Sequence, residues 1–394
     1  MKRRVSIEPF YKIICLFLLS LLVGCSGNPT KTSICLAQNT TTNQAIAQNK
    51  QVVKRFRIGS HDRKWGYIDD SGTITIQPQF KEAYGFSEGL ALAKSEELWG
   101  FIDKTGSFVV PPQFDDALAF SEQRAAVKTQ NLWGFIDSTG KSIVEPQFDA
   151  VRSFSEQRSA VQTNNLWGFI DSTGKFIVEP QFINVSDFSE ERAAVQTSNY
   201  KTGFIDRTGK LAIEAQYSEV TNFKFGLAGV KLRKPSFWGL REKTPLWGFI
   251  DRNGKPVTSW KFEFVSEFSE CLAGVKRGKY GYLDLDGKMA IPFQFDLVYP
   301  FQEGRAAVRF GNLWGYINPQ GEWIKEPNLM QARSFSEGLA AAQMGKKWGY
   351  LNDRGEVAID PEFDLAYSFY NGLAKVKVGK TWRYIDRTGR YIWP

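Results

Sequence analysis

Two kinds of carboxylate recur through this sequence at regular spacing and could carry acid–base chemistry. Glutamates follow a Phe-Ser step, and aspartates open a four-residue turn that ends in glycine. The glutamates are Glu88, Glu122, Glu156, Glu190, Glu270 and Glu337. A glycosidase needs two carboxylates whose surroundings give them different pKa values, whereas groups repeated in every unit have matching surroundings. We therefore expect these acids to cap turns, and we expect no catalytic residue among them.

Residues that serve as metal ligands or nucleophiles are scarce. His61 is the single histidine, which excludes a Ser-His-Asp triad built elsewhere in the chain and most zinc sites. Calcium takes six or more oxygens, and each Asp-x-x-Gly turn usually brings one acid. We therefore expect no metal site and no cofactor. Of the four cysteines, Cys271 is expected to be an unpaired thiol, and a disulfide with Cys35 is the alternative.

The composition of the 394 residues is that of an ordinary globular protein, with 42% hydrophobic and 23% charged residues. Aromatic residues at 14%, together with 35 glycines and 16 prolines, favour β-structure over helical bundles. The formal net charge of +8 is spread over a long chain, and four basic residues lie before position 25. Such a weak field does not indicate nucleic-acid binding.

The elements that must position these residues repeat along the chain. A Trp-Gly step recurs about every 34 residues. Its tryptophans are Trp65, Trp99, Trp133, Trp167, Trp247, Trp314 and Trp348, and degenerate copies begin at Thr202, Tyr280 and Trp382. The sequence therefore contains about ten units, and we expect the tryptophans to be structural parts of the core rather than a ligand platform.

The repeated unit resembles the WG repeat, also called the KWG repeat, over residues 52–394. The shared features are the step Trp-Gly-Phe-Ile-Asp, a Thr-Gly-Lys turn, the segment Ile-Val-Glu-Pro-Gln-Phe and a Phe-Ser-Glu step. That resemblance implies a β-rich array of bacterial origin and a binding role. It brings no catalytic residue with it.

Each unit predicts a three-stranded antiparallel meander. In the third unit the strands are 124–127, 132–137 and 141–144, with a short turn at 137–140, and Pro146 is expected to end the strand pairing. A lone meander cannot bury its face, so neighbouring units must stack. We expect an all-β fold of about ten units stacked as an open, curved solenoid or superhelix. A closed ring like a β-propeller is the alternative. The open arrangement is preferred because 34 residues are few for a four-stranded propeller blade.

The first 51 residues indicate export and anchoring. Residues 1–24 combine three early basic residues with an apolar stretch that is too short to span a bilayer, as in a signal peptide. The tetrapeptide Leu22-Val23-Gly24-Cys25 resembles a bacterial lipobox, so we expect lipidation of Cys25. Residues 25–51 are then a flexible tether. The expected location is the cell membrane or the outer membrane of a bacterium.

The regular spacing is interrupted by an insertion at residues 231–246. In repeat arrays such insertions lie in loops on one face, often the binding face. The insertion combines basic and aromatic residues, which suit an anionic glycan or an acidic protein surface. The candidate binding residues are Lys231, Arg233, Lys234, Phe237, Trp238 and Arg241. The alternative interpretation is a tolerated loop extension or the remnant of a degenerate unit.

These patterns predict a membrane-anchored, non-catalytic protein that binds protein or polysaccharide in the cell envelope. An envelope glycan hydrolase and a purely structural spacer are the alternatives. We expect a monomer that does not bind nucleic acid.

Overall fold

The structure, a computed structural model, describes residues 56–59, 64–232 and 246–393. All 38 regular elements in this part of the chain are β-strands. They form ten antiparallel sheets, which we number blade 1 to blade 10 in chain order. Eight blades have four strands, and blades 1 and 6 have three. Within the described residues no helix could cross a membrane.

The strands are grouped by blade as follows. Blade 1 contains β1 (Phe56–Gly59), β2 (Trp65–Ile68) and β3 (Ile74–Phe80), and blade 2 contains β4 (Glu82–Ser87), β5 (Leu90–Ser95), β6 (Leu98–Ile102) and β7 (Phe108–Phe114). Blade 3 contains β8 (Asp116–Ala117), β9 (Arg124–Thr129), β10 (Leu132–Asp137) and β11 (Ser142–Phe148), and blade 4 contains β12 (Ala150–Val151), β13 (Arg158–Thr163), β14 (Leu166–Asp171) and β15 (Phe176–Phe182). Blade 5 contains β16 (Asn184–Val185), β17 (Ala193–Gln196), β18 (Thr202–Ile205) and β19 (Leu211–Tyr217), and blade 6 contains β20 (Glu219–Val220), β21 (Leu227–Leu232) and β22 (Leu246–Asp251).

The remaining four blades follow the same order. Blade 7 contains β23 (Phe264–Val265), β24 (Ala273–Arg277), β25 (Lys279–Leu283) and β26 (Met289–Phe295), and blade 8 contains β27 (Leu297–Val298), β28 (Ala306–Phe310), β29 (Leu313–Ile317) and β30 (Trp323–Leu329). Blade 9 contains β31 (Gln331–Ala332), β32 (Ala340–Met344), β33 (Lys347–Leu351) and β34 (Val357–Phe363), and blade 10 contains β35 (Leu365–Ala366), β36 (Leu373–Val378), β37 (Thr381–Asp386) and β38 (Tyr391–Trp393).

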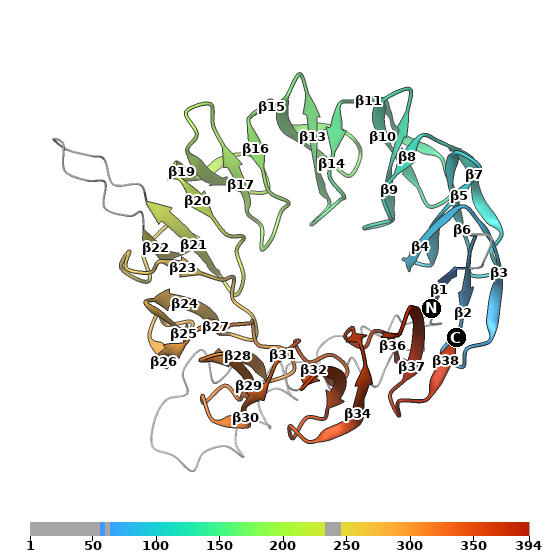
Figure 1. The fold of residues 1–394 in the computed structure, drawn as a ribbon. Coiled ribbons are helices and arrows are strands. Elements are labelled where there is room, and N and C mark those ends of the chain that lie inside the picture. The colour runs from blue at the N-terminus through green and yellow to red at the C-terminus, as the bar shows by residue number, and fades with distance from the viewer. Residues whose placement is uncertain (1–55, 60–63, 233–245, 394) are drawn as a thin grey trace, which may run out of the picture.

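The three-stranded unit expected from the sequence is corrected by a fourth strand in most blades. In blade 3 the extra strand β8 has two residues, and Asp116 and Ala117 pair with Lys128 and Val127. Two residues are too few to produce an alternating pattern, so this segment has no strand signal of its own and was expected to be part of a loop. These short strands lie on the inside of the ring, and the seven-residue strands lie at its rim (Figure 1).

The outer strand requires the glycine of the Trp-Gly step in every such blade except blade 6, where Gly248 has no backbone atom closer than ordinary contact. A side chain at Gly134 would place its Cβ 2.4 Å from the carbonyl oxygen of Val144. The register between β10 and β11 shifts at this point, and β11 continues through Pro146 to Phe148. The proline was expected to end the strand, but at a bulge its missing N–H costs the sheet nothing.

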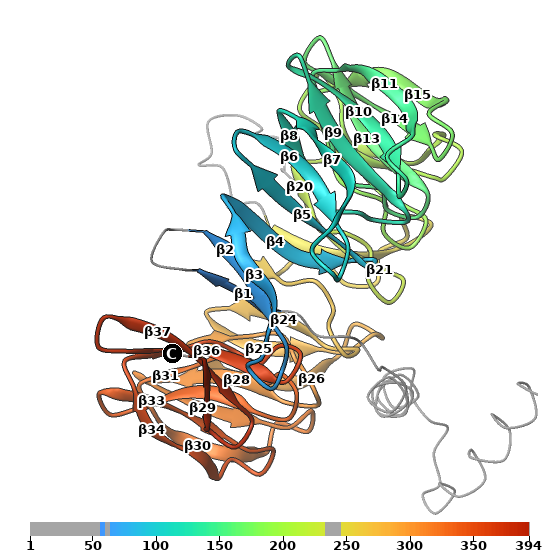
Figure 2. The same ribbon diagram turned by 90° about the vertical axis from the view of Figure 1, so that its right-hand side faces the viewer.

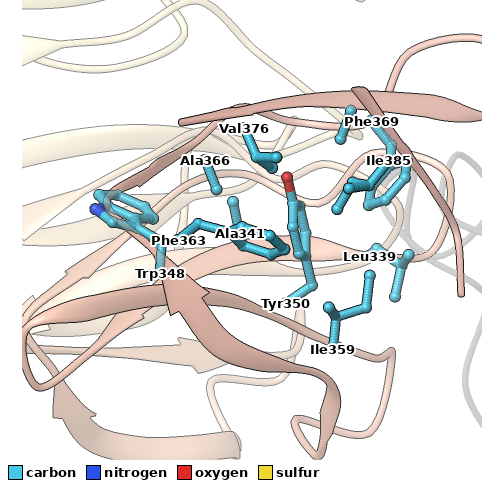
Figure 3. Close-up of a cluster of buried hydrophobic side chains, with 11 residues drawn as sticks. Leu339, Ala341, Trp348, Tyr350, Ile359, Phe363, Ala366, Phe369, Val376 and Ile385 are labelled. Carbon is cyan, nitrogen blue, oxygen red and sulfur yellow. The ribbon is translucent and has the colours of Figure 1, made fainter. Parts of the chain in front are cut away.

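Hydrophobic side chains fill the space between each pair of neighbouring blades. Between blades 9 and 10, Trp348, Tyr350 and Phe363 pack against Phe369 and Ile385 (Figure 3). The other interfaces have equivalent clusters, one for each pair of neighbours. The core is therefore divided into layers, and each blade is buried only through the blades beside it.

The first and last blades pack on each other. Ile58 and Ile68 of blade 1 are buried against Leu373 of blade 10. A Cβ at Gly72 would lie 2.3 Å from the carbonyl oxygen of Ile392. Figure 1 shows blade 1 beside β36–β38, and Figure 2 shows β1–β3 between blade 2 and blade 10. Of the two expected arrangements, the ring is the one in which the first and last blades pack on each other. No sheet contains strands from both ends of the chain, so the ring closes through the packing of blade faces.

Blade 6 departs from the common pattern on its outer side. The segment after β22 makes isolated bridges, Ile250 with Pro256 and Trp247 with Phe262, in place of a continuous fourth strand. Residues 233–245, which join β21 to β22, lie outside the described residues. The departure and the insertion thus fall in the same blade.

Candidate binding surface

The candidate binding residues of the insertion can be placed only at its start. Lys231 lies on β21, where its Nζ is 2.6 Å from Glu219 Oε1 and 5.6 Å from the ring centre of Trp247. Its charge is therefore already engaged within blade 6. Five candidates lie outside the described residues: Arg233, Lys234, Phe237, Trp238 and Arg241. A binding role for the insertion stays a prediction.

The repeated glutamates join each blade to the next. The carboxylate of Glu88 in blade 2 accepts hydrogen bonds from the backbone N–H groups of Glu122 and Gln123 in blade 3, at 2.8 and 2.7 Å. Both donor residues have positive φ, so the carboxylate holds a turn that most residues adopt reluctantly. The same bond is made by Glu122, Glu156, Glu190, Glu270, Glu303 and Glu337. The expected capping role is confirmed.

The repeated aspartates are also used within the fold. Asp137 Oδ1 accepts hydrogen bonds from the hydroxyl and backbone N–H of Thr139 and from the N–H of Lys141. The hydroxyl of Thr139 is the main cause of the lowered pKa of Asp137. The pKa is lowered in the same way at Asp103, Asp171 and Asp206. Matching surroundings shift these acids in one direction, which is the opposite of an acid–base pair.

One cavity brings two acids together. It has a volume of about 330 Å³, lies between blades 6 and 7, and is lined by Asp251, Asp286 and the apolar Phe225 and Leu227, among others. Asp251 Oδ1 is occupied by the N–H groups of the turn that follows it. Among the described residues, no three histidine, cysteine, aspartate or glutamate side chains converge as a metal site.

Cys271 differs from its prediction. Its side chain is fully buried and it forms a disulfide, whereas an unpaired thiol was expected. The other three cysteines, Cys15, Cys25 and Cys35, lie outside the described residues. The sequence assigns those three to the signal peptide, the lipid anchor and the tether, and the alternative to an unpaired thiol was a disulfide with Cys35.

Most of the repeat tryptophans pack into the core. Trp99, Trp247, Trp314 and Trp348 are buried, with at most 9% of their surface exposed. Trp65, Trp133 and Trp167 are half-buried and pack at the edges of inter-blade clusters. Trp382 is the exception at 36% exposed. The pairing of β37 with β38 covers Tyr384 and Ile385, whereas Trp348 in blade 9 lies opposite Phe363.

In several blades the residue that follows the two-residue inner strand covers the tryptophan of the same blade. In blade 8, Tyr299 stacks on Trp314 with ring centres 5.1 Å apart and an interplanar angle of 17°. In blade 10, the ring of Tyr367 is 5.7 Å from that of Trp382. These tyrosines are 38% and 43% exposed, so one layer of aromatic rings faces solvent over another. We call this place in each blade the inner position.

Arg333 links blade 9 to blade 10 at the inner position. Its guanidinium carbon lies 5.3 Å from the ring centre of Trp348 and 4.9 Å from that of Tyr367. Its Nε donates a hydrogen bond of 2.9 Å to the carbonyl oxygen of Ala366 in blade 10. Tyr299, Arg333 and Tyr367 thus form a run of planar groups over three successive blades, which we call the aromatic arc.

Blades 5 to 7, which precede the arc in the ring, have small polar residues at the inner position. In blades 5 and 7, Ser186 and Ser266 accept hydrogen bonds from backbone N–H groups and donate to neighbouring carbonyl oxygens. In blade 6, Thr221 accepts one from Gly229. These side chains fold back onto their own blades and present no flat surface. The sequence reasoning missed the aromatic arc because it considered what the units share, whereas the arc is built from a position at which they differ.

Comparisons with known proteins agree with the repeated architecture. A family model described as a WG containing repeat matches nine successive segments: residues 65–99, 99–133, 133–167, 167–201, 203–234, 247–279, 280–314, 314–348 and 348–382. No curated protein matches the sequence.

Similar folds occur among solved structures of low sequence identity. A crystal structure of the eukaryotic initiation factor has a TM-score of 0.52 at 10% identity, covering 87% of this chain and 95% of that one. BamB from Moraxella catarrhalis has a TM-score of 0.36 at 9% identity, covering 70% of this chain and 97% of that one. Apo AztD from Citrobacter koseri has a TM-score of 0.32 at 11% identity, covering 66% and 90%. At such identities the first likeness concerns the fold alone.

Proposed function

Because the chain belongs to the WG containing repeat family, and because its repeated polar groups are used to join its blades, we propose that it is a non-catalytic binding scaffold of the cell envelope. The observation that carries this proposal is that residues shared by the repeat units stabilise the fold, whereas a position that differs between units is exposed. The shared acids cap turns and clamp blades. The variable inner position leaves aromatic rings exposed on one side of the ring.

We further propose that the protein is exported and held at a membrane by lipid on Cys25. The support is in the sequence: a basic start, a short apolar stretch and a lipobox-like tetrapeptide that ends at Cys25. A disulfide at Cys271 agrees with an oxidising compartment outside the cytosol. Acyl chains on one cysteine, followed by residues 25–51 as a tether, would hold the ring away from the bilayer as a monomer.

A pull-down from envelope extracts with the full-length chain tests the binding role. We expect it to retain an envelope polysaccharide or protein that is absent from a control with an unrelated lipoprotein. Retention of nothing would favour the spacer alternative. The anchor is tested separately with Cys25→Ala, which we expect to leave the detergent phase after phase separation. Partitioning of that variant with membranes would contradict lipid anchoring.

A glycan hydrolase remains the second candidate because of the cavity between blades 6 and 7. Asp286 lines this cavity and is the third residue of its turn, a place at which other units have residues such as Thr139. Its carboxylate is therefore not one of the acids that recur in every unit. A hydrolase would release reducing ends from envelope polysaccharide and lose that activity in Asp286→Asn. We expect no release from the unchanged protein, since Asp251 in the same cavity is held by its own turn.

A further inference from the structure

Arginine occurs at the inner position in two blades, and the two arginines differ in their partners. Arg152 in blade 4 lies over Trp167 at 5.6 Å, and its Nη1 is 3.9 Å from Asp187 Oδ1 in blade 5. Arg333 lies over Trp348 in the same way. The residue equivalent to Asp187 in the following blade is Ser368. The same cation is therefore neutralised in one place and not in the other.

Arg333 is held ready to receive an anion. The rings of Trp348 and Tyr367 lie within cation–π distance of its guanidinium, and Nε is bonded to the carbonyl of Ala366. These contacts fix the plane of the guanidinium and leave its two terminal nitrogens for a bidentate partner. Within the described part of the chain, no carboxylate lies at ion-pair distance from Arg333. Its positive charge is therefore available to a ligand.

The neighbouring side chains fit sugar rings. Tyr299 is 38% exposed and Tyr367 is 43% exposed, and each carries a hydroxyl group at the edge of its ring. The apolar C–H face of a pyranose stacks on such a ring, and its hydroxyls bond to polar groups at the rim. Lys377 adds positive charge beside the arc, because its Nζ lies 5.9 Å from the ring centre of Trp382. Flat aromatic faces and cations in successive blades suit a ligand that repeats along its length and carries negative charge.

We propose that the aromatic arc binds an acidic polysaccharide, with Arg333 pairing a uronate carboxylate while Tyr299 and Tyr367 stack on sugar rings. This rests on the proposed binding function and names its ligand class and its place. A peptide is less well suited, because the edge strands β27, β31 and β35 beside the arc have only two residues each for strand addition. Asp187 and Glu267, each next to the inner position of its blade, make blades 5 and 7 unfavourable for the same ligand.

Calorimetric titration of the full-length chain with an oligogalacturonide tests the proposal. The matched probe is the same oligosaccharide with its carboxyl groups methyl-esterified, which keeps the sugar rings and removes the charge. We expect binding of the acidic form, weakening with added salt, and binding of the ester that is about tenfold weaker or more. Equal affinity for both forms, or no binding of the acidic form, would overturn the proposal.

The variant pair Arg333→Gln and Arg152→Gln separates the site from general charge effects. Both variants remove one positive charge from the same position of a blade, so they match in charge and location. Thermal unfolding of both variants checks that they fold. We expect Arg333→Gln to lose about tenfold or more in affinity for the acidic form and Arg152→Gln to bind as the unchanged protein does. Tyr367→Ala should also weaken binding, with the ester affected as much as the acid.

The outcomes also distinguish this proposal from the broader one. Unchanged binding by Arg333→Gln would refute the arc as the site and leave the scaffold function standing. Binding of poly-glutamate with the same dependence on Arg333 would show that the anion is recognised but the glycan class is wrong. Failure of both the oligosaccharide and the envelope pull-down would contradict the scaffold function as well.

Discussion

The interface between blades 9 and 10 and the interface between blades 10 and 1 show how the ring is held together. The first buries eleven residues in one cluster, including Trp348, Tyr350 and Phe369. Among the described residues, the second buries three, Ile58, Ile68 and Leu373, with four more partly buried. Apolar burial is the main stabilising term in such arrays. Among the described residues, the closing interface is therefore the one with the fewest buried side chains.

The difference follows from one missing segment. Blades 2 to 10 begin with an inner strand and a loop whose phenylalanine, such as Phe369, fills the interface with the preceding blade. No Phe-Ser-Glu step precedes β1 in the sequence. On the other side of the seam, Trp382 is 36% exposed, whereas Trp348 is 4% exposed. The aromatic arc thus ends at the closing interface, where blade 10 is least covered.

The largest effect is expected from the tyrosines that occupy the same place in blades 9 and 10. Tyr350 is fully buried and donates a hydrogen bond to the carbonyl oxygen of Tyr367 at 2.8 Å. Tyr350→Ala should cost about 4 kcal/mol of unfolding free energy. Tyr384→Ala in blade 10, where the ring is half-buried, should cost about 2 kcal/mol. Chemical denaturation of both variants measures the difference, and equal losses would contradict a weak closing interface.

The next effect concerns two glycines with similar backbone angles. Gly72 has φ +87° and lies against Ile392, whereas Gly89 has φ +91° and open space around its Cβ position. Gly89→Ala should cost about 1 kcal/mol, the usual strain of a left-handed residue. Gly72→Ala should cost more and should speed hydrogen exchange in β1 and β2, because blade 1 must move away from blade 10. Equal effects of the two substitutions would mean that the closing contact contributes nothing.

A smaller effect is expected from the clamp between blades 9 and 10. The carboxylate of Glu337 accepts a hydrogen bond of 2.8 Å from the N–H of Gly372. Glu337→Ala should cost about 1–2 kcal/mol by leaving that amide without its charged acceptor. Asn371 occupies the same place in blade 10, next to the closing interface. Asn371→Ala should change the unfolding free energy by less than about 0.5 kcal/mol, and a larger loss would show a clamp across the seam.

The smallest effect is a pH dependence of blade 10. Partial burial opposes ionisation of Asp386, but the hydroxyl of Thr388 and backbone N–H groups outweigh it and lower the pKa of Asp386. A lowered pKa in the folded state adds stability above the ordinary value of about 3.9, and this is lost as the pH falls through the folded value. Asn352 holds the equivalent turn in blade 9 and does not titrate. Urea denaturation at acidic and neutral pH should show a weaker pH dependence for Asp386→Asn and a stronger one for Asn352→Asp.

The sequence predicted the parts of the fold that repeat with a clear local cause. The Asp-x-x-Gly turns, the Trp-Gly strand and the capping glutamates were all found because their spacing is regular and their chemistry is local. The two-residue inner strands, such as β8, were missed because they exist through pairing with a neighbour and have no pattern of their own. Closure of the ring was not determined by the sequence, since packing of Ile58 on Leu373 joins residues far apart in the chain.

The binding surface was harder to predict than the fold. Sequence reasoning selected the insertion because it breaks the period, and Lys231 at its start is engaged within blade 6. The aromatic arc keeps the period and changes one residue in each unit. Aligning the units of the sequence shows arginine at the same position in two of them, Arg152 and Arg333. The sequence could not show that Asp187 neutralises Arg152. Variable positions in a regular array therefore merit as much attention as its irregular segments.

Photo-cross-linking from position 392 tests the closed ring most directly. A benzophenone amino acid placed at Ile392 in the dilute, monomeric full-length chain would react with whichever segment lies beside β38. Closure predicts cross-links to the turn around Gly72 within the same chain, identified by mass spectrometry of the digested product. Cross-links confined to blade 10, or formed only between different chains, would contradict the ring.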